Sequence, residues 1–377
     1  MKIGLYIHIP FCQQKCLYCD FPSYANMDYL YNDYVTALCR EIAGQGGLYA
    51  GQVVDTVYIG GGTPSLLSNK ELAVILDSVM RSFNLAIDAE VSIEANPGTI
   101  NKEKLALLKG SGVNRISFGV QSFSDSLLQT IGRIHTAAEA IQAVNMAHQT
   151  GFENINVDLM YGLPGQTTAD VGESINIAAA LSVEHLSIYG LKVEAGTPFA
   201  ELYAHGKLGM PSEDVDEDMY DLVASLTSSL GYERYEISNY ARKGYACKHN
   251  LKYWHYQPYI GIGASAHSFQ RGERMANTGC VTEYIRLINE GHSTIGFSEK
   301  VVGESAMAEF IFLALRTVRG LKYEHFNNYF NADFFHKYGA VISDLEQRKL
   351  ITIEVDGIRL TEFGMKYGNV VFVAFLD

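Results

Sequence analysis

The sequence has little that would tie the chain to a membrane or to a nucleic acid. No apolar run among its 377 residues approaches the roughly 20 residues that a membrane-spanning helix needs. Basic residues are few, with 29 Lys and Arg against 42 Asp and Glu, and the formal net charge is −13. Domains that bind nucleic acids present a basic face. We therefore expect neither a membrane span nor a nucleic-acid partner.

Cysteine is also scarce, and its distribution argues against a disulfide framework. Of six cysteines, three are scattered, and the other three lie close together near the start of the chain. The first residues lack the small-residue cleavage site of a signal peptide. Few cysteines and one cluster are typical of a reducing compartment. We predict a cytoplasmic protein in which the scattered cysteines are small buried residues.

The clustered cysteines follow an alternating β-branched run, residues 5–9, which predicts a strand that ends at Pro10. Thiolates in a cluster select zinc or iron–sulfur. A structural zinc site takes four protein ligands, and an electron-transfer [4Fe–4S] cluster usually has four cysteines. The local set here stops at three, namely Cys12, Cys16 and Cys19. We predict a [4Fe–4S] cluster with one iron unligated by protein; a zinc site completed by His8 is the alternative.

The spacing Cys-x3-Cys-x2-Cys after a first strand resembles the radical SAM superfamily. That resemblance implies that S-adenosylmethionine binds the open iron through its amino group and carboxylate. The chemistry of such a pair belongs to the cofactor.

Strands alternate with helices over the first 230 or so residues, which predicts parallel β/α units. Six strands spaced in this way predict an α/β fold with an incomplete (β/α)6 barrel, whose chemistry lies on the loops after the strands. The predicted strands are 5–9, 53–59, 90–95, 115–120, 154–160 and 185–189. Capping boxes of Ser68 with Glu71 and of Thr136 with Glu139 predict the starts of two helices, and a further helix is predicted over 168–180.

The pattern changes after about residue 236, where an aromatic and glycine-rich stretch, 238–268, has no clear period. Helices over 304–316, 323–330 and 333–348, followed by a hairpin around Asp356-Gly357, resemble a small winged-helix domain. We expect a radical SAM barrel over residues 1–235, a connecting segment over 236–300 and a C-terminal domain over 301–377.

Polar side chains stand at the ends of the otherwise apolar predicted strands. Glu94, Gln121 and Asp158 end three strands, and Arg133 follows on the chain. Buried polar groups need partners, and one shared ligand would satisfy all four. A salt bridge between Arg133 and Glu94 is the alternative. The turn Gly60-Gly-Gly-Thr-Pro64 follows the second strand, where glycines let backbone N–H groups approach a ligand.

These strand-end residues, with the stretch Tyr-Ile-His-Ile-Pro-Phe-Cys from Tyr6, resemble the oxygen-independent coproporphyrinogen III oxidase branch of the superfamily. The resemblance covers nearly the whole chain. It implies contacts to S-adenosylmethionine from Tyr6, Tyr18, Gly61, Gly62, Thr63, Glu94, Gln121, Arg133 and Asp158. The oxidases themselves carry a fourth cysteine two residues after the third, where this chain has Phe21. That difference speaks against decarboxylation of coproporphyrinogen and leaves open whether the protein is an enzyme.

The stretch His249-Asn-Leu-Lys-Tyr253-Trp254 is similar to the pattern of the HemW-type haem chaperones of this branch. A histidine nitrogen can be an axial ligand of haem iron, and Tyr and Trp offer flat apolar faces. Lys248 and Lys252 could meet the propionates. We predict His249 as the iron ligand, with three residues as alternatives: Cys247, His255 and His267.

The resemblance implies a chaperone that binds haem and passes it to haem-requiring respiratory proteins at the membrane. It leaves open whether the cluster performs radical chemistry or orders the protein and promotes a homodimer. The alternatives are an oxygen-independent coproporphyrinogen III oxidase, a haem-degrading or methylating relative, and a zinc protein with a winged-helix adaptor.

Overall fold

A computed structural model describes residues 2–376, and its centre is a curved, open sheet of 12 strands. Six strands run parallel in chain order, as predicted, and the sheet does not close because β14 and β9 form its two edges. The prediction of an incomplete barrel is confirmed. The six strands are β1 (Lys2–Ile9), β4 (Val53–Gly61), β5 (Asn84–Ala95), β6 (Arg115–Gln121), β7 (Ile155–Tyr161) and β8 (His185–Gly190).

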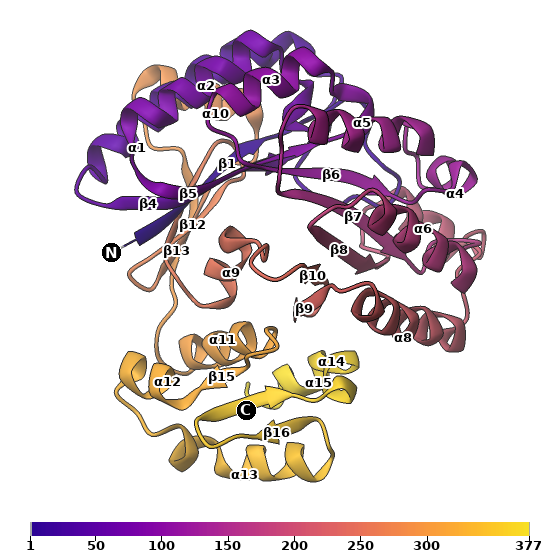
Figure 1. Ribbon diagram of the computed structural model, residues 1–377. Helices are drawn as coiled ribbons and strands as arrows, with labels where there is room; N and C mark the ends of the chain where they lie inside the picture. The colour runs from indigo at the N-terminus through magenta and orange to yellow at the C-terminus, as the bar shows by residue number, and fades with distance from the viewer. Residues whose placement is uncertain (1, 377) are drawn as a thin grey trace.

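Helices cover the outer, convex face of this sheet (Figure 1). Ser68 with Glu71 and Thr136 with Glu139 form capping boxes, which begin two of these helices at the expected places. Their apolar faces pack on the sheet in one continuous core. Every helix within residues 2–376 is too short or too polar to cross a membrane. The covering helices are α1 (Tyr31–Leu48), α2 (Asn69–Ser82), α3 (Lys102–Gly110), α5 (Ala137–Gln149), α6 (Thr168–Ala180) and α8 (Glu213–Ser229).

The stretch without a clear period is more regular than expected. It contains β11, which pairs parallel with β1 and extends the sheet beyond the six predicted strands, and the short helix α9, which lies on the concave side (Figure 1). Gly261 interrupts the apolar pattern of strand β11. The position has no room for a side chain, because a Cβ there would lie 2.0 Å from the His267 carbonyl oxygen. The division of the chain at residues 235 and 300 stays a prediction. The added elements are β9 (Glu233–Glu236), β10 (Asn239–Ala241), α9 (Lys248–Trp254), β11 (Tyr259–Ile262), β12 (His267–Gln270), β13 (Glu273–Asn277), α10 (Val281–Glu290) and β14 (Ile295–Lys300).

The C-terminal domain has the predicted helices and hairpin, with a separate core built around Ile311, Phe326 and Phe334. Its elements are α11 (Gly303–Leu315), β15 (Leu321–Lys322), α12 (Tyr323–Phe330), α13 (Phe334–Gln347), β16 (Ile351–Ile353), β17 (Gly357–Leu360), α14 (Glu362–Lys366) and α15 (Gly368–Val373). The remaining short strands and α-helices are β2 (Phe11–Cys12), β3 (Tyr24–Ala25), α4 (Asp125–Thr130) and α7 (Pro198–Ala204). Three 3-10 helices are η1 (Asp28–Leu30), η2 (Pro64–Leu66) and η3 (Pro97–Thr99).

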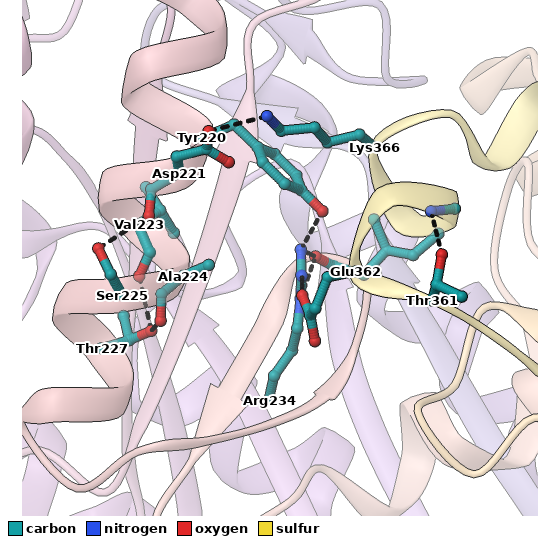
Figure 2. A network of polar contacts seen from close by, with 12 residues as sticks. Tyr220, Asp221, Val223, Ala224, Ser225, Thr227, Arg234, Thr361, Glu362 and Lys366 are labelled. Carbon is teal, nitrogen blue, oxygen red and sulfur yellow. Dashed lines mark hydrogen bonds and ion pairs between the residues drawn. The ribbon is translucent and has the colours of Figure 1, made fainter. Parts of the chain in front are cut away.

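Ion pairs join the C-terminal domain to the barrel (Figure 2). Lys366 of α14 contacts Glu217 and Asp221 of α8, at 2.7 and 2.8 Å. Arg234 of β9 donates to the Tyr220 hydroxyl at 2.8 Å and pairs with Glu362. The acidic partners are exposed, so each pair stabilises the docking only slightly.

Candidate functional site

A cavity of about 390 Å³ lies at the carboxyl ends of the parallel strands and extends into the concave side of the sheet. We call it the thiol-lined cavity. It brings together every predicted cluster and S-adenosylmethionine residue except Tyr6, although these residues are spread over five strands and their loops. Among its lining residues are Cys12, Cys16, Tyr18, Cys19, Gly61, Gly62, Thr63, Glu94, Gln121, Arg133 and Asp158.

The three thiols are free and stand on a loop whose ends are tied together. Phe11–Cys12 pairs with Tyr24–Ala25 as a short parallel bridge, and the Tyr24 N–H donates to the Pro10 carbonyl at 2.8 Å. Arg133 Nη1 donates to Cys16 Sγ at 3.4 Å, and the Thr63 hydroxyl lies 3.7 Å from Cys12 Sγ. Arg133 therefore places a positive charge beside the thiol that would carry negative charge as a metal ligand.

The glycine turn packs directly against the cysteine loop. A Cβ on Gly61, whose φ is +115°, would lie 2.5 Å from His8 Cε1, and one on Gly62 would lie 2.5 Å from the Phe11 carbonyl oxygen. The N–H groups of Gly62 and Thr63 donate to Ile9 and Phe11, and that of Gly61 donates to Glu94. The prediction that these N–H groups meet a ligand is therefore wrong, since they hold the turn to the loop. A ligand amino group would have to meet carbonyl oxygens here.

The two buried carboxyl groups of the cavity are held by neutral donors. Glu94 accepts from the Tyr58 hydroxyl at 2.9 Å and from the Gly61 N–H at 3.0 Å. Asp158 accepts from Asn156 Nδ2 at 2.7 Å and from the Ser117 hydroxyl at 3.3 Å. Burial, and secondly repulsion by Asp158, raises the pKa of Glu94 to about 7. Burial also raises the pKa of Asp158.

Arg133 does not pair with Glu94, so that alternative is wrong. Its terminal nitrogens donate to Asn96 Oδ1 at 2.7 Å, to the Gly119 carbonyl and to Cys16. Gln121 ends β6 with a φ of 71°, a conformation that non-glycine residues rarely adopt outside functional or tightly constrained positions. Such strain fits a side chain that is aimed at a ligand.

The donor set fits the cofactors that the sequence predicts. Three thiols line one hollow beside a buried cation, and the buried Nε of Arg133 has no hydrogen-bond partner within residues 2–376. A carboxylate would supply that acceptor. The hollow also holds the two carboxyl groups and Gln121, which suit the hydroxyls of a ribose.

A second cavity, of about 520 Å³, lies between the barrel and the C-terminal domain. We call it the aromatic cavity. It shares Phe21, Gly61 and Glu94 with the thiol-lined cavity, so the two adjoin. Leu313 and Glu309 of α11 close it from the C-terminal domain. The rings on its wall are Tyr6, His8, Tyr253, Trp254, Tyr256, Tyr259, His267 and Phe269.

Helix α9 carries the predicted haem motif and contributes to both cavities. Asn250 lines the thiol-lined cavity, whereas Tyr253 and Trp254 line the aromatic one. The Glu90 carboxylate holds the first turn by accepting from the N–H groups of Lys248 and His249, each at 3.0 Å. This is the favourable arrangement of an anion at a helix N-terminus.

His249 itself faces neither cavity. Its side chain is buried, with Nδ1 hydrogen-bonded to the Thr56 hydroxyl at 2.9 Å and Nε2 to the Tyr253 hydroxyl at 2.8 Å. Burial, together with Lys252 and Arg115, lowers the pKa of His249 to about 3. His249 as the iron ligand stays a prediction, and coordination would require breaking one of these bonds. Lys252 is buried in an ion pair with Asp55 at 2.7 Å, which makes it a poor partner for propionates.

Sequence reasoning missed several lining residues. Tyr256, Tyr259 and Phe269 come from short elements whose facing the sequence did not reveal. Arg115 begins the predicted strand 115–120, and it lies on the cavity face of β6 with Ser117 and Gln121. Its even spacing from Gln121 was a usable signal, because alternate residues of a strand share a face.

Comparison with known proteins agrees with this architecture. Residues 6–178 match the Radical SAM superfamily, and residues 303–366 match the HemN C-terminal domain. The chain is 40% identical over 372 residues to the heme chaperone HemW of Bacillus subtilis (strain 168), with 98% of each chain covered. It is 42% identical over 266 residues to the heme chaperone HemW of Escherichia coli (strain K12), covering 70% of this chain and 69% of the relative.

A solved structure shares the fold across the whole molecule. The coproporphyrinogen III oxidase HemN from Escherichia coli, a radical SAM enzyme, superposes with a TM-score of 0.87 at 23% identity, covering 99% of this chain and 89% of that one. At this identity the likeness shows the fold alone. The sequence identity to the curated relatives over nearly the full length carries the family assignment, and the chain therefore belongs to the HemW family of the radical SAM superfamily.

Proposed function

We propose that this protein is a cytoplasmic haem chaperone, which binds haem and passes it to haem-requiring respiratory proteins at the membrane. The observation that carries the proposal is the aromatic cavity, which adjoins the thiol-lined cavity at Phe21, Gly61 and Glu94. The names of the HemW relatives support it. Six unpaired cysteines support a reducing compartment.

The aromatic cavity has the chemistry that a flat macrocycle needs. Its volume of about 520 Å³ falls within the range of small-molecule pockets, about 300–1,000 Å³. Tyr253 and Tyr259 meet edge to face, with ring centroids 4.6 Å apart, and Trp254 stacks beneath the Arg316 guanidinium. Aromatic rings supply large apolar faces at little cost in side-chain entropy.

His267 is the residue best suited to ligate haem iron. Among the four candidates it alone lines the aromatic cavity, and its ring nitrogens make no hydrogen bond within residues 2–376. Both ring nitrogens of His249 are already hydrogen-bonded, and the Cys247 thiol donates to Glu90 at 3.5 Å. Burial lowers the pKa of His267, and the neutral imidazole is the form that binds iron.

We further propose a [4Fe–4S] cluster on Cys12, Cys16 and Cys19, with S-adenosylmethionine at the open iron. Arg133 would hold the carboxylate through its unpaired Nε, and Glu94 and Gln121 would accept from or donate to the ribose hydroxyls. When bound, the cluster supplies an electron for radical chemistry or orders the loop that carries it. The second role would fix the position of Phe21 where the two cavities adjoin, and a homodimer could form on the ordered surface.

Haem titration tests the proposal, with the emission of Trp254 as one readout because it is the only tryptophan. Haem in the aromatic cavity should quench this emission and give a Soret band. The His267→Ala variant should bind haem roughly tenfold more weakly and shift the band, because the axial ligand is lost. The control is His292→Ala, on a side chain that is 64% exposed. Unchanged binding in His267→Ala would remove this ligand, and no binding by the parent protein would remove the function.

The oxidase alternative is tested on the same reconstituted sample. Phe21 stands where the oxidases carry a fourth cysteine, and it is 63% exposed at the junction of the two cavities. We expect no protoporphyrinogen from coproporphyrinogen under anaerobic conditions. Its formation, with carbon dioxide released from two propionates, would replace the chaperone by an enzyme.

A further inference from the structure

Two arginines face the thiol-lined cavity, and their surroundings differ. Arg133 donates to three acceptors. Arg115 lines the same cavity and is only 2% exposed, yet its guanidinium makes no hydrogen bond or ion pair of 4.0 Å or less within residues 2–376. Its Nε is completely buried without an acceptor. A guanidinium keeps its charge in proteins and offers five N–H donors in a rigid fork.

The two arginines lie at opposite ends of the cavity. Arg115 is the first residue of β6, whereas Arg133 donates to the carbonyl of Gly119, four residues further along the strand. At about 3.3 Å per residue these two points lie roughly 13 Å apart along the strand. One small carboxylate cannot reach both Arg133 and Arg115, so Arg115 marks a distinct inner end of the cavity.

Three carboxylates of the chain act on Arg115 electrostatically, but none is hydrogen-bonded to its guanidinium or paired with it within 4.0 Å. Each bonds to other donors: Glu90 caps α9, Glu94 accepts from Tyr58 and Gly61, and Asp158 accepts from Asn156 and Ser117. Removing a charged group from water without a hydrogen-bonded partner is strongly unfavourable. A charged side chain left without acceptors on the wall of a cavity is a candidate for binding a ligand.

We propose that the inner end of the thiol-lined cavity is a carboxylate-binding subsite in which Arg115 is the anchoring residue. The guanidinium fork would donate two parallel N–H bonds to the two carboxylate oxygens. Asn250 of α9 lines the same cavity and offers a further amide donor. The subsite is separate from the one assigned above to the carboxylate of S-adenosylmethionine, which belongs to Arg133.

The carboxylate could come from haem or from a free small acid. Arg115 lies across from Ser92 on β5, two residues before Glu94, and Glu94 lines both cavities. A propionate of haem in the aromatic cavity would extend past Glu94 towards Arg115. This first source rests on the proposed function, whereas a free carboxylate does not.

The first experiment uses the full chain without haem. Propionate should raise the thermal unfolding temperature of the parent protein in a saturable way, and the isosteric neutral propionamide should not. Arg115→Gln should lose the response, and Arg115→Lys should keep only part of it because Lys lacks the fork. The matched control is Arg286→Gln, on a surface arginine of α10 that is 51% exposed.

The second experiment compares haem with its dimethyl ester, which has no free carboxylate. If the source is a propionate, Arg115→Gln should weaken haem binding roughly tenfold and leave binding of the ester unchanged. If propionate stabilises the parent protein but Arg115→Gln does not distinguish haem from its ester, the subsite takes a free acid.

The subsite is overturned if Arg115→Gln affects haem and its dimethyl ester equally and propionate does not stabilise the parent protein. If the parent protein does not bind haem, the proposed function fails and the first experiment still decides the subsite. If Arg115→Gln does not fold, the Arg115→Lys variant decides whether the subsite exists. Two comparisons on the parent protein, of propionate with propionamide and of haem with its dimethyl ester, decide it as well.

Discussion

The two adjoining cavities are built in different ways. The thiol-lined cavity is walled by alternate residues of neighbouring parallel strands, with polar groups at the strand ends. The aromatic cavity is assembled from elements far apart in the chain, from Tyr6 of β1 and Trp254 of α9 to Leu313 of α11. One cavity is therefore a property of a single sheet, and the other is a property of how two domains dock.

The two cavities should therefore respond differently to mutation. The thiol-lined cavity depends on local geometry in the cysteine loop and the glycine turn, both within the barrel. The aromatic cavity depends in addition on the contacts between α8 and α14. A change that affects both equally would contradict the distinction.

Loss of one thiol should have the largest effect. Cys16→Ser should abolish iron and sulfide loading of anaerobically reconstituted protein, because a cluster on two thiolates has too few ligands. Haem binding in the aromatic cavity should persist. The measurement is iron and acid-labile sulfide beside a haem titration. Cys280→Ser is the control and should load normally, because this cysteine lies outside both cavities and is exposed, so the prediction that it is buried is wrong. Joint loss of iron and haem would argue that the cavities are not independent.

Crowding the glycine turn should come next. Gly62→Ala should lower the free energy of unfolding by about 1–3 kcal/mol, because the new Cβ would meet the Phe11 carbonyl oxygen at 2.5 Å. It should also weaken S-adenosylmethionine binding. Gly44→Ala is the matched control, since nothing lies within 4 Å of a Cβ there. Within α1 it should instead stabilise by about 0.5–1 kcal/mol. Urea unfolding measures both, and a neutral Gly62→Ala would refute the close packing of turn and loop.

The carboxyl group of Glu94 should make stability depend on pH. The folded protein holds this proton up to a pKa of about 7, above the ordinary value of 4.5, because the side chain is buried. The stabilisation is therefore complete below the ordinary pKa and is lost as the pH rises through about 7. Glu94→Gln should reduce the loss of stability between about pH 5 and about pH 8 by about 1–2 kcal/mol. Glu103→Gln, on an exposed helix position, should follow the parent curve. Identical curves for Glu94→Gln and the parent would show that this carboxyl group does not titrate in that range.

Loosening the domain contact should have the smallest effect. Lys366→Met removes two ion pairs whose acidic partners are 52% and 62% exposed, so it should cost less than about 1 kcal/mol. Haem affinity should fall by about two- to threefold while iron loading stays unchanged. Lys337→Met breaks a comparable pair with Glu304 inside the C-terminal domain and should leave haem affinity unaltered. A larger loss of iron than of haem in Lys366→Met would reverse the comparison.

Much of the fold was predictable from local patterns. The six parallel strands, helix α6 at Thr168–Ala180, helix α12 at Tyr323–Phe330 and two capping boxes appeared where period and cap residues predicted them. The residues of the thiol-lined cavity were predictable for the same reason, because carboxyl ends of parallel strands meet at one edge of a sheet. The predicted role of the glycine N–H groups was wrong, since they bind the cysteine loop, and Arg115 was missed as a lining residue.

Local patterns could not reveal what depends on contacts between distant segments. The motif on α9 predicted His249 as the haem ligand, but both of its ring nitrogens are hydrogen-bonded, one of them to Thr56 of β4. His267, the first residue of β12, lines the aromatic cavity instead. The spacing of Arg115 from Gln121 predicts only which face of β6 it occupies; its lack of an acceptor depends on the nearby carboxylates, which bond to other donors. Strand period and helix caps act over a few residues and so can be read along the chain. The side chains that surround a buried group come from several elements, and their arrangement arises only when those elements pack.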